Sequence, residues 1–302
     1  MNNYKNVIKE LRSKYKNFNI LENDIDAFQY YKDFSIVYNK FQIAQDQNLI
    51  CGIYPIKPIQ YPVVSKPIYN LLGMGTGSKK ITNCEELDCF NNGNFWCEFL
   101  NGDHYSWDLI VRNGIILYHT CFLGVKKTFG TFEYWKQLEL KIPKNVYFFL
   151  NKYLKNFTGN VNLETIGGKV IEIHLRMGDI DLVDYDVIKL SILNLIEKND
   201  DIIKIQMNII NQKKINYIYL VPVWEKLDKF INLENKYNYI KEHFKYILDE
   251  DDNITSYYFD DVNHPNPNGY KRWFLLLSYD LKKTIKIKNK MENLIKNINL
   301  PI

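Results

Sequence analysis

The sequence predicts an α+β fold, and three observations point to it. Alternating apolar residues between glycine turns predict paired strands at about 62–125, helical patterns lie on either side of this region, and a tight two-strand hairpin is expected at 158–177. This mixed order differs from the regular strand–helix alternation of a doubly wound parallel sheet. The chain has 302 residues, 46% of them hydrophobic, which suffices for one large core or two ordinary ones.

The first half of the chain begins with helical patterns. Residues 1–38 are expected to form a short helix and a connector, and residues 39–50 a helix that leads into an apolar, proline-containing stretch at 51–62. The strand-like region follows. A further helix is predicted over 143–157, where Pro143 suits the first turn because its missing N–H would have no partner there.

The second half continues the mixed order. Its expected elements are the hairpin at 158–177, helices within 184–212, an extended run at 215–224, a helix at about 225–248, a strand at 254–260 and a long final helix at about 270–298. The polar loop 264–269 precedes the final helix. A helix N-terminus can bind an anion, but a capping connector is the simpler interpretation of this loop.

Lysine dominates the basic residues. Lys and Arg number 39 together, yet only four are arginine: Arg12, Arg112, Arg176 and Arg272. A rare arginine in such a background is expected where a planar fork of donors is needed. Arg272 is expected to bind a substrate carboxylate or to pin the final helix, and Arg112 to lie at the surface as readily as in a site.

The charge and cysteine patterns exclude several classes of protein. The net charge is only +4 and the lysines are spread along the chain, which disfavours nucleic-acid binding; the run 282–288 is interpreted as a solvated helix face. The five cysteines form no CxxC motif, so free thiols in a reducing compartment are expected. Without an apolar run of about 20 residues or a signal peptide, we expect no membrane span and a cytoplasmic protein.

A lysine followed by alternate glycines indicates an anion site. Lys66 ends an apolar strand, and Gly73, Gly75 and Gly77 follow it. Such glycines let backbone N–H groups approach an anion, and the lysine adds a point charge for phosphate. A flexible hairpin turn is the alternative interpretation.

Polar residues alternate on the strand after 94–100. His104, Ser106 and Asp108 share one face of it, and the following Asn113-Gly114 predicts a two-residue hairpin turn that would place Asp108 opposite His119. One of these groups could accept a proton in catalysis. A solvated strand face is the alternative.

The hairpin at 158–177 carries the most informative polar row. Glu164 on its first arm, and Glu172, His174 and Arg176 on its second, alternate with apolar residues. For both apolar rows to face one core the loop should have an odd length, which predicts a three-residue loop at 167–169. The polar side chains then converge. Two carboxylates suit Mg²⁺ shared with phosphates, and an arginine suits the phosphate; a cross-strand ladder of salt bridges is the alternative.

The order of these segments resembles the ATP-grasp superfamily over about residues 36–180. Glu172-Ile173-His174-Leu175-Arg176 is similar to the family's metal-binding strand, with histidine where asparagine is commoner. The resemblance implies the following roles: metal ligands Glu164, Glu172 and His174; nucleotide-contacting lysines Lys40 and Lys66; a phosphate lid of Gly73, Gly75 and Gly77; and a hinge for adenine and ribose of Glu98, Phe99 and Leu100. Arg176, His104 and Asp108 are the expected catalytic residues.

The resemblance also implies an architecture and an activity. Two α+β lobes would hold the nucleotide between them, divided into an N-terminal part (1–60), a lid and hinge (61–125), a metal-binding core (126–180) and a C-terminal extension (181–302). The implied activity is an ATP- and Mg²⁺-dependent ligase that joins a small-molecule or peptide carboxylate to an amine through an acyl phosphate. A phosphotransferase on the same fold, a non-catalytic nucleotide-binding regulator and a homodimeric assembly stay open.

Overall fold

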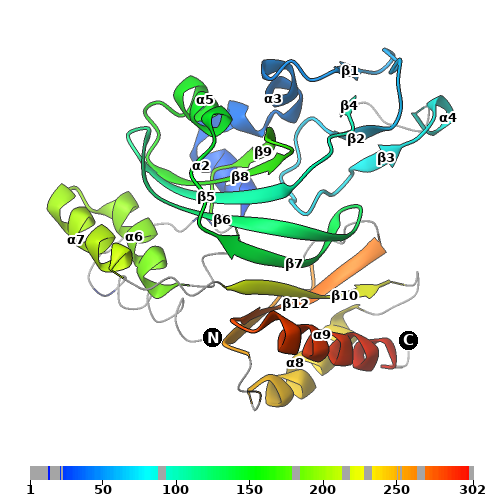
Figure 1. The fold of residues 1–302 in the computed structure, drawn as a ribbon, viewed down its shortest axis with the longest axis vertical. Coiled ribbons are helices and arrows are strands. Elements are labelled where there is room, and N and C mark those ends of the chain that lie inside the picture. The colour runs from blue at the N-terminus through cyan, green and yellow to red at the C-terminus, as the bar shows by residue number, and fades with distance from the viewer. Residues whose placement is uncertain are drawn as a thin grey trace. The chain divides into compact units, whose positions relative to one another are not determined.

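A computed structural model of the chain describes residue 13, residue 21 and the ranges 23–87, 93–178, 184–212, 218–227, 233–249, 251, 254–263 and 269–298 (Figure 1). The fold is α+β, as the sequence predicts. It divides into a larger unit, residues 2–123 with 138–214, and a smaller unit, residues 124–137 with 215–302. No helix among the described residues is long and apolar enough to cross a membrane. The described cysteines Cys51, Cys84, Cys97 and Cys121 are free thiols.

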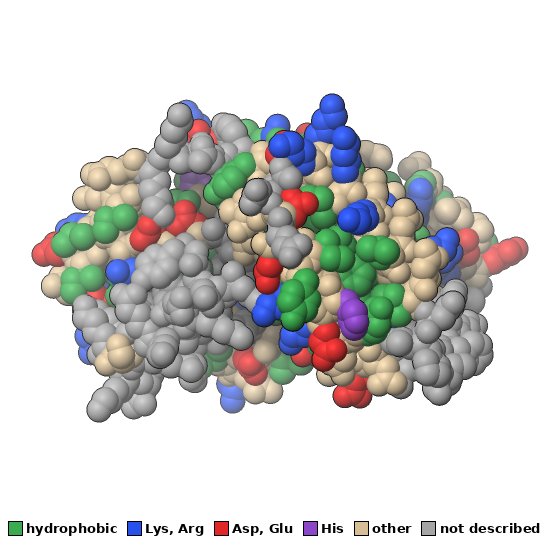
Figure 2. All heavy atoms as spheres, turned by 90° about the horizontal axis from the view of Figure 1, so that it is seen from below, with side chains coloured by type: hydrophobic (Ala, Val, Ile, Leu, Met, Phe, Trp, Pro, Cys, Tyr) green, Lys and Arg blue, Asp and Glu red, His purple; other side chains and the backbone are tan. Residues whose placement is uncertain are grey.

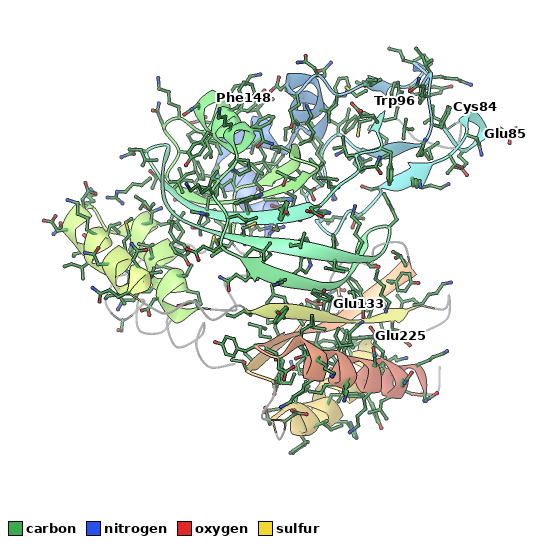
Figure 3. The ribbon with its side chains drawn as sticks, viewed as in Figure 1. Cys84, Glu85, Trp96, Glu133, Phe148 and Glu225 are labelled. Carbon is green, nitrogen blue, oxygen red and sulfur yellow. The ribbon has the colours of Figure 1, made fainter. Side chains whose placement is uncertain are left out.

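The larger unit contains a four-stranded antiparallel sheet, which we call the lid sheet. Its strands, in spatial order, are β1 (Cys51–Ile53), β4 (Asn94–Glu98), β2 (Val63–Pro67) and β3 (Lys79–Ile81). The short helix α4 (Cys84–Leu87) follows β3, and Figure 3 shows Cys84 and Glu85 at that helix and Trp96 on the sheet. Trp96 is buried with Val63 and Ile81, and its indole N–H donates to the carbonyl oxygen of Ile56 at 2.6 Å.

Three further antiparallel strands of this unit carry the site, and we call them the core strands. They are β5 (His104–Arg112), β8 (Gly159–Ile166) and β9 (Lys169–His174). Their apolar sides, with Leu109, Leu163 and Ile173, are fully buried against four short helices. These helices are α2 (Asp24–Tyr30), η1 (Lys32–Tyr38), α3 (Lys40–Asp46) and α5 (Lys144–Tyr153).

The end of β5 shows the predicted turn and the contacts of Arg112. Asn113 and Gly114, with φ of 49° and 75°, form the predicted two-residue turn before β6 (Ile115–Thr128). Arg112 is half-buried rather than at the surface. Its guanidinium donates to the carbonyl oxygens of Asn194 and Glu197, at the end of α6 (Tyr185–Ile196), and lies 2.9 Å from Asp200 at the start of α7 (Asp200–Asn211). Arg112 therefore connects the end of α6 with the start of α7.

The smaller unit contains strands in the order β11 (Ser256–Phe259), β12 (Tyr270–Ser278), β10 (Tyr219–Lys226) and β7 (Thr131–Leu138). Helices α8 (Leu233–Asp249) and α9 (Leu281–Lys296) pack on a core that includes Val221, Phe244, Trp273 and Met291. Two buried lysines of these helices meet strand glutamates: Lys236 lies 2.7 Å from Glu225, and Lys288 pairs with Glu133. Figure 3 marks both glutamates. On the face in Figure 2, basic and acidic side chains both occur, with apolar ones between them.

The predicted helix at 270–298 is wrong in its first part. Residues 270–278 form β12, and α9 begins only at Leu281. The run 271–278 is buried throughout, and its continuous apolar part, 273–277, does not distinguish a buried strand from a buried helix by periodicity. Arg272 is buried on β12, and its Nε and Nη2 donate to Asp260 at 2.7 and 2.9 Å. Because a strand follows the loop 264–269, the anion site considered for a helix N-terminus does not apply there. Residues 264–268 of the loop lie outside the described ranges. Strand β7 was also missing from the expected elements.

The predicted three-residue loop of the hairpin is wrong too, although the polar row it was meant to explain is present. Gly167 and Gly168 form a two-residue turn, with φ of 55° and 78°, so that Ile166 pairs with Lys169. The register then shifts, because Ile171 is an extra residue that bulges from β9. From there on Glu164 pairs with Glu172, and Val170 and Ile173 are both buried in one core.

Candidate active site

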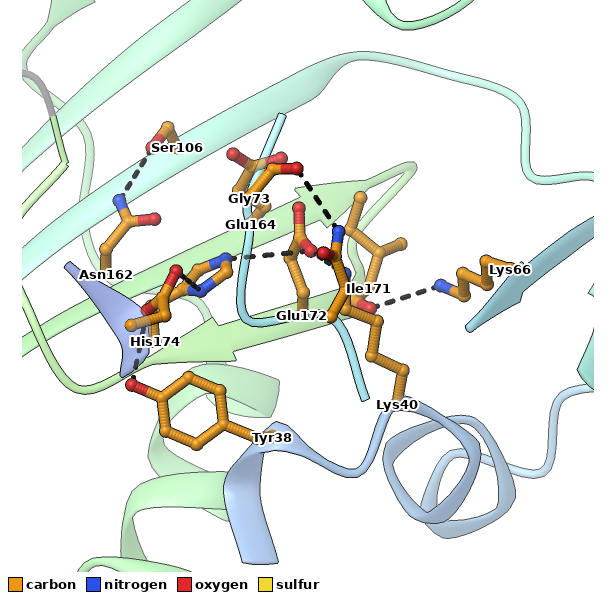
Figure 4. Close-up of polar contacts among 12 residues, drawn as sticks. Tyr38, Lys40, Lys66, Gly73, Ser106, Asn162, Glu164, Ile171, Glu172 and His174 are labelled. Carbon is orange, nitrogen blue, oxygen red and sulfur yellow. Dashed lines mark hydrogen bonds and ion pairs between the residues drawn. The ribbon is translucent and has the colours of Figure 1, made fainter. Parts of the chain in front are cut away.

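A polar face crosses the three core strands (Figure 4). Ser106 of β5 lies opposite Glu164 of β8, which lies opposite Glu172 of β9. The next row consists of Asp108, Asn162 and His174. The structure thus brings together the alternate residues of β5 and the two expected metal carboxylates, which the sequence had placed in separate motifs.

Glu172 lies between two cationic side chains. Lys40, the first residue of α3, donates to Oε2 of Glu172, and Nε2 of His174 lies 3.6 Å from the same oxygen. Burial raises the pKa of the Glu172 carboxyl, but the charges of Lys40 and His174 outweigh it and hold the pKa well below its usual range. Glu172 is therefore a charged oxygen donor.

Glu164 is held from the β5 side. Nε2 of His104 lies 2.7 Å from Oε2 of Glu164, and His104 itself is buried. His104, expected as a catalytic residue, thus lies against a carboxylate that was expected to bind metal.

Asp24, which no sequence motif indicated, contacts three other polar residues of the site. This residue at the start of α2 is only 2% exposed, and its Oδ2 lies 3.0 Å from Nδ1 of His174 and 2.9 Å from Nη2 of Arg176. Its Oδ1 accepts a hydrogen bond from the Tyr38 hydroxyl at 3.2 Å. Burial raises the pKa of Asp24, but His174 and Arg176 together lower the pKa to about 2.

His174 has both ring nitrogens directed at carboxylates, Asp24 on one side and Glu172 on the other. Burial lowers its pKa, but the two carboxylates raise the pKa of His174 to about 9. His174 thus lies between two carboxylates, and its role as a metal ligand stays a prediction.

Lys66 reaches from the lid sheet to the core strands. Its ammonium donates to the carbonyl oxygen of Ile171 at 3.2 Å and lies 5.6 Å from the centre of the Phe95 ring. Burial lowers the pKa of Lys66. Lys66 thus lies beside the bulge that precedes Glu172.

The glycine loop between β2 and β3 lies close to Arg176. Gly73, Gly75 and Gly77 have φ of 70°, 62° and 77°, a backbone that side chains other than glycine rarely adopt. A Cβ added to Gly73 would lie 3.7 Å from Nη2 of Arg176, and the Asn70 amide donates to the Gly73 carbonyl oxygen at 3.2 Å. The loop is therefore tied down beside an arginine of the site.

The expected hinge residues follow β4. Glu98 pairs with Ile50 twice, through its backbone N–H and through its carboxylate, which accepts from the Ile50 N–H at 2.9 Å. The Lys80 ammonium lies 4.6 Å from the centre of the Phe99 ring. Glu98, Phe99 and Leu100 are all half-buried where the lid sheet leads into β5.

Asp108 is buried and hydrogen-bonded, unlike a proton acceptor that is open to substrate. It is 3% exposed, and its Oδ1 accepts from the Asn162 amide at 3.0 Å and from the Gly178 N–H at 2.6 Å. Asp108 therefore holds the chain that leaves the site after Arg176. His119 contacts the Leu140 carbonyl oxygen and the Trp107 ring, and its expected position opposite Asp108 stays a prediction.

The donor set fits magnesium only through two carboxylates. Within the described ranges, no group of three or more His, Cys, Asp or Glu side chains is arranged to hold a metal ion by itself. Mg²⁺, however, is commonly bound by one or two protein carboxylates and completes its shell with phosphate oxygens and water. Glu164 and Glu172, directly opposite one another, satisfy that requirement.

No protein-family model matches the chain, and no curated protein matches it in sequence. Solved structures are similar in fold. An L-amino acid ligase from Bacillus licheniformis has a TM-score of 0.53 at 13% identity, over 86% of this chain and 72% of that chain.

Two further structures carry bound nucleotide. A carboxyaminoimidazole ribonucleotide synthase from Aspergillus clavatus, complexed with ATP, has a TM-score of 0.54 at 9% identity, over 97% of this chain and 79% of that chain. An N5-carboxyaminoimidazole synthetase from Staphylococcus aureus, complexed with ADP, has a TM-score of 0.50 at 12% identity, over 85% and 72%. At such identities the likeness concerns the fold.

Proposed function

Because the chain has the ATP-grasp fold of these enzymes, we propose that it is an ATP- and Mg²⁺-dependent ligase that joins a carboxylate to an amine through an acyl phosphate. One observation carries the proposal: Glu164 and Glu172 face each other on paired strands, with Lys40 bonded to Glu172, Lys66 beside the bulge that precedes Glu172, and Arg176 four residues beyond Glu172, where it binds Asp24. Two oxygen donors beside three cations are the complement of a magnesium-bound polyphosphate.

The nucleotide would be held by residues of both sheets of the larger unit. Lys40 and Lys66 would contact phosphate oxygens, the glycine loop would cover the phosphates, and residues 98–100 would border the base and ribose. Lys40 now neutralises Glu172, so phosphate binding would exchange one anionic partner of this lysine for another. Magnesium, when bound to Glu164 and Glu172, would neutralise phosphate charge.

The chain's own groups account for the remaining chemistry. Arg176 and Lys66 would stabilise the charge that develops on the transferring phosphoryl group. The glycine loop would keep water from the acyl phosphate. His104, which lies 2.7 Å from Glu164, and Asp108, which is bonded to Asn162 and Gly178, are the candidates to accept the amine proton. The substrates would be a small-molecule or peptide carboxylate and an amine, and the cytoplasm is the predicted compartment.

The decisive experiment measures thermal stabilisation by ATP with Mg²⁺ in wild type, Glu172→Ala and Glu85→Ala. Glu85 is an exposed glutamate of α4 and serves as the matched control. Wild type and Glu85→Ala should be stabilised and Glu172→Ala should not. A wild type that does not respond to magnesium nucleotide would overturn the proposal.

Turnover separates the ligase from its rivals. ADP and phosphate released only when mixtures of carboxylic acids and amines are added would support a ligase. A stable phosphorylated product would indicate a phosphotransferase instead. Nucleotide binding that survives Glu172→Gln, with no ADP released, would indicate a regulatory protein.

A further inference from the structure

We propose that Asp24 is a positioning residue for phosphoryl transfer. Its carboxylate orients Arg176 toward the glycine loop and His174 toward Glu172. The inference rests on the proposed function, because it assigns Arg176 to the phosphoryl group. Asp24 lies in α2, outside every segment in which the sequence indicated chemistry.

The geometry converges on one carboxylate. Three groups from different elements surround Asp24: the Tyr38 hydroxyl of η1 and Nη2 of Arg176, just beyond β9, donate hydrogen bonds to it, and Nδ1 of His174 on β9 lies 3.0 Å away as an ion-pair partner. A buried carboxylate is costly unless its oxygens are paired, and here both oxygens are occupied. Asp24 is thereby fixed, and it fixes the groups that donate to it.

Arg176 is held at two points of its planar guanidinium. Nη2 donates to Asp24 at 2.9 Å and Nη1 donates to the Met177 carbonyl oxygen at 2.8 Å. Two contacts on a rigid fork determine its orientation as well as its position. The held Nη2 lies beside Gly73, the first glycine of the loop. Arg176 is therefore oriented toward the lid before any phosphate arrives, which is the preorganisation that electrostatic stabilisation requires.

The Asp24 carboxylate also orients His174 toward Glu172, one of the two carboxylates proposed to bind magnesium. By pairing with Nδ1, Asp24 orients the ring so that Nε2 lies 3.6 Å from Glu172. Outer partners of this kind orient the residues that touch a metal or substrate, and their loss commonly weakens affinity or activity about tenfold to a hundredfold.

A purely structural role is the alternative, and Tyr38 provides the matched control. The Tyr38 hydroxyl donates a hydrogen bond to Asp24 and accepts one from the Leu175 N–H at 3.0 Å. Tyr38→Phe therefore removes two hydrogen bonds of the same cluster and leaves the contacts of Asp24 with Arg176 and His174 in place. If Asp24 only stabilises the fold, Asp24→Asn should behave like Tyr38→Phe.

The test compares the affinities of the full chain for magnesium ATP and magnesium ADP by calorimetry. In wild type, Arg176 should make ATP bind more tightly than ADP. Asp24→Asn should lose about tenfold or more of ATP affinity with little change for ADP, whereas Tyr38→Phe should lower the melting temperature and keep the ATP-to-ADP ratio. Asp24→Glu, which keeps the charge, should recover part of the ratio and covers the case in which Asp24→Asn does not fold.

Coupling to Arg176 completes the test. In an Arg176→Lys background, Asp24→Asn should cause no further loss of ATP preference, because both changes act through one guanidinium. The inference is overturned if Asp24→Asn keeps the wild-type ratio, or if its loss adds fully to that of Arg176→Lys. A wild type that binds neither nucleotide would instead remove the proposed function, and this inference with it.

Discussion

The ammonium of Lys66 donates a hydrogen bond to the carbonyl oxygen of Ile171, the residue that bulges from β9. Lys66 belongs to the lid sheet and Ile171 to the core strands. An unpaired carbonyl at a bulge would otherwise lack a partner in the strand ladder. The irregularity that precedes Glu172 therefore also supplies the acceptor that holds a lysine at the site.

Replacing Lys66 by methionine should separate binding from stability. Methionine keeps much of the buried volume and removes an ammonium whose pKa is lowered by burial, but it also leaves the Ile171 carbonyl oxygen without this donor, so the stability of the nucleotide-free protein should change little. Affinity for magnesium ATP should fall about tenfold to a hundredfold, as expected for a lost charge-assisted hydrogen bond. Urea unfolding and calorimetry measure the two effects. Lys79→Met, an exposed lysine of β3, should change neither, and unaltered ATP affinity in Lys66→Met would refute the assignment.

The polar row of the hairpin could be predicted from the sequence, but the way the chain achieves it could not. Alternation and the need for one apolar face imply that Glu164 and Glu172 lie together. A three-residue loop and a two-residue turn with a bulge both satisfy that condition. The choice depends on tertiary contacts, such as the one between Ile171 and Lys66, that leave no mark in the local pattern.

Asp24 and β12 show two other limits. Asp24 meets Arg176 across 152 positions of sequence, and an aspartate at the start of a helix is ordinarily interpreted as a favourable charge near the helix N-terminus. Residues 273–277 are apolar on both faces because both faces are buried, which removes the alternation by which a strand is recognised. The scarcity of arginine drew attention to Arg176, which pairs with Asp24 in the candidate site.

The Lys40–Glu172 pair should show strong coupling in nucleotide-free protein. Both side chains are largely buried, so Glu172→Gln alone leaves the Lys40 ammonium without its carboxylate and should cost about 3 kcal/mol or more in the free energy of unfolding, whereas Lys40→Met leaves Glu172 with His174 as its partner and should cost less. The double variant should recover most of that loss. A double-mutant cycle in urea measures the coupling, and single losses that simply add would contradict the ion pair.

Acid should weaken the Asp24 cluster in a defined pH window. Burial raises the pKa of Asp24, but His174 and Arg176 outweigh burial and lower the pKa to about 2, from an ordinary value of 3.8. Because the folded-state pKa is the lower one, the contribution is fully present above about pH 4 and is lost as the pH falls toward 2. The contribution amounts to about 2 kcal/mol.

The measurement is the free energy of unfolding of wild type and Asp24→Asn between pH 6 and pH 2. The difference between the two should shrink by about 2 kcal/mol as the pH falls. Asp33→Asn, at an exposed aspartate of η1, should show no such trend. A constant difference between wild type and Asp24→Asn would mean that the Asp24 carboxyl is not held in its charged form.

The Gly167-Gly168 turn offers a matched pair of substitutions. Both glycines have positive φ, so alanine at either position should cost about 1 kcal/mol for the left-handed backbone. At Gly167 the added Cβ would also lie 2.2 Å from the carbonyl oxygen of Asn101, whereas at Gly168 nothing lies within 4 Å. Gly167→Ala should therefore be clearly less stable than Gly168→Ala in urea unfolding. In the three-residue loop that the sequence favoured, this ranking has no basis, so equal losses at the two positions would argue against the two-residue turn and against the bulge at Ile171 that the turn requires.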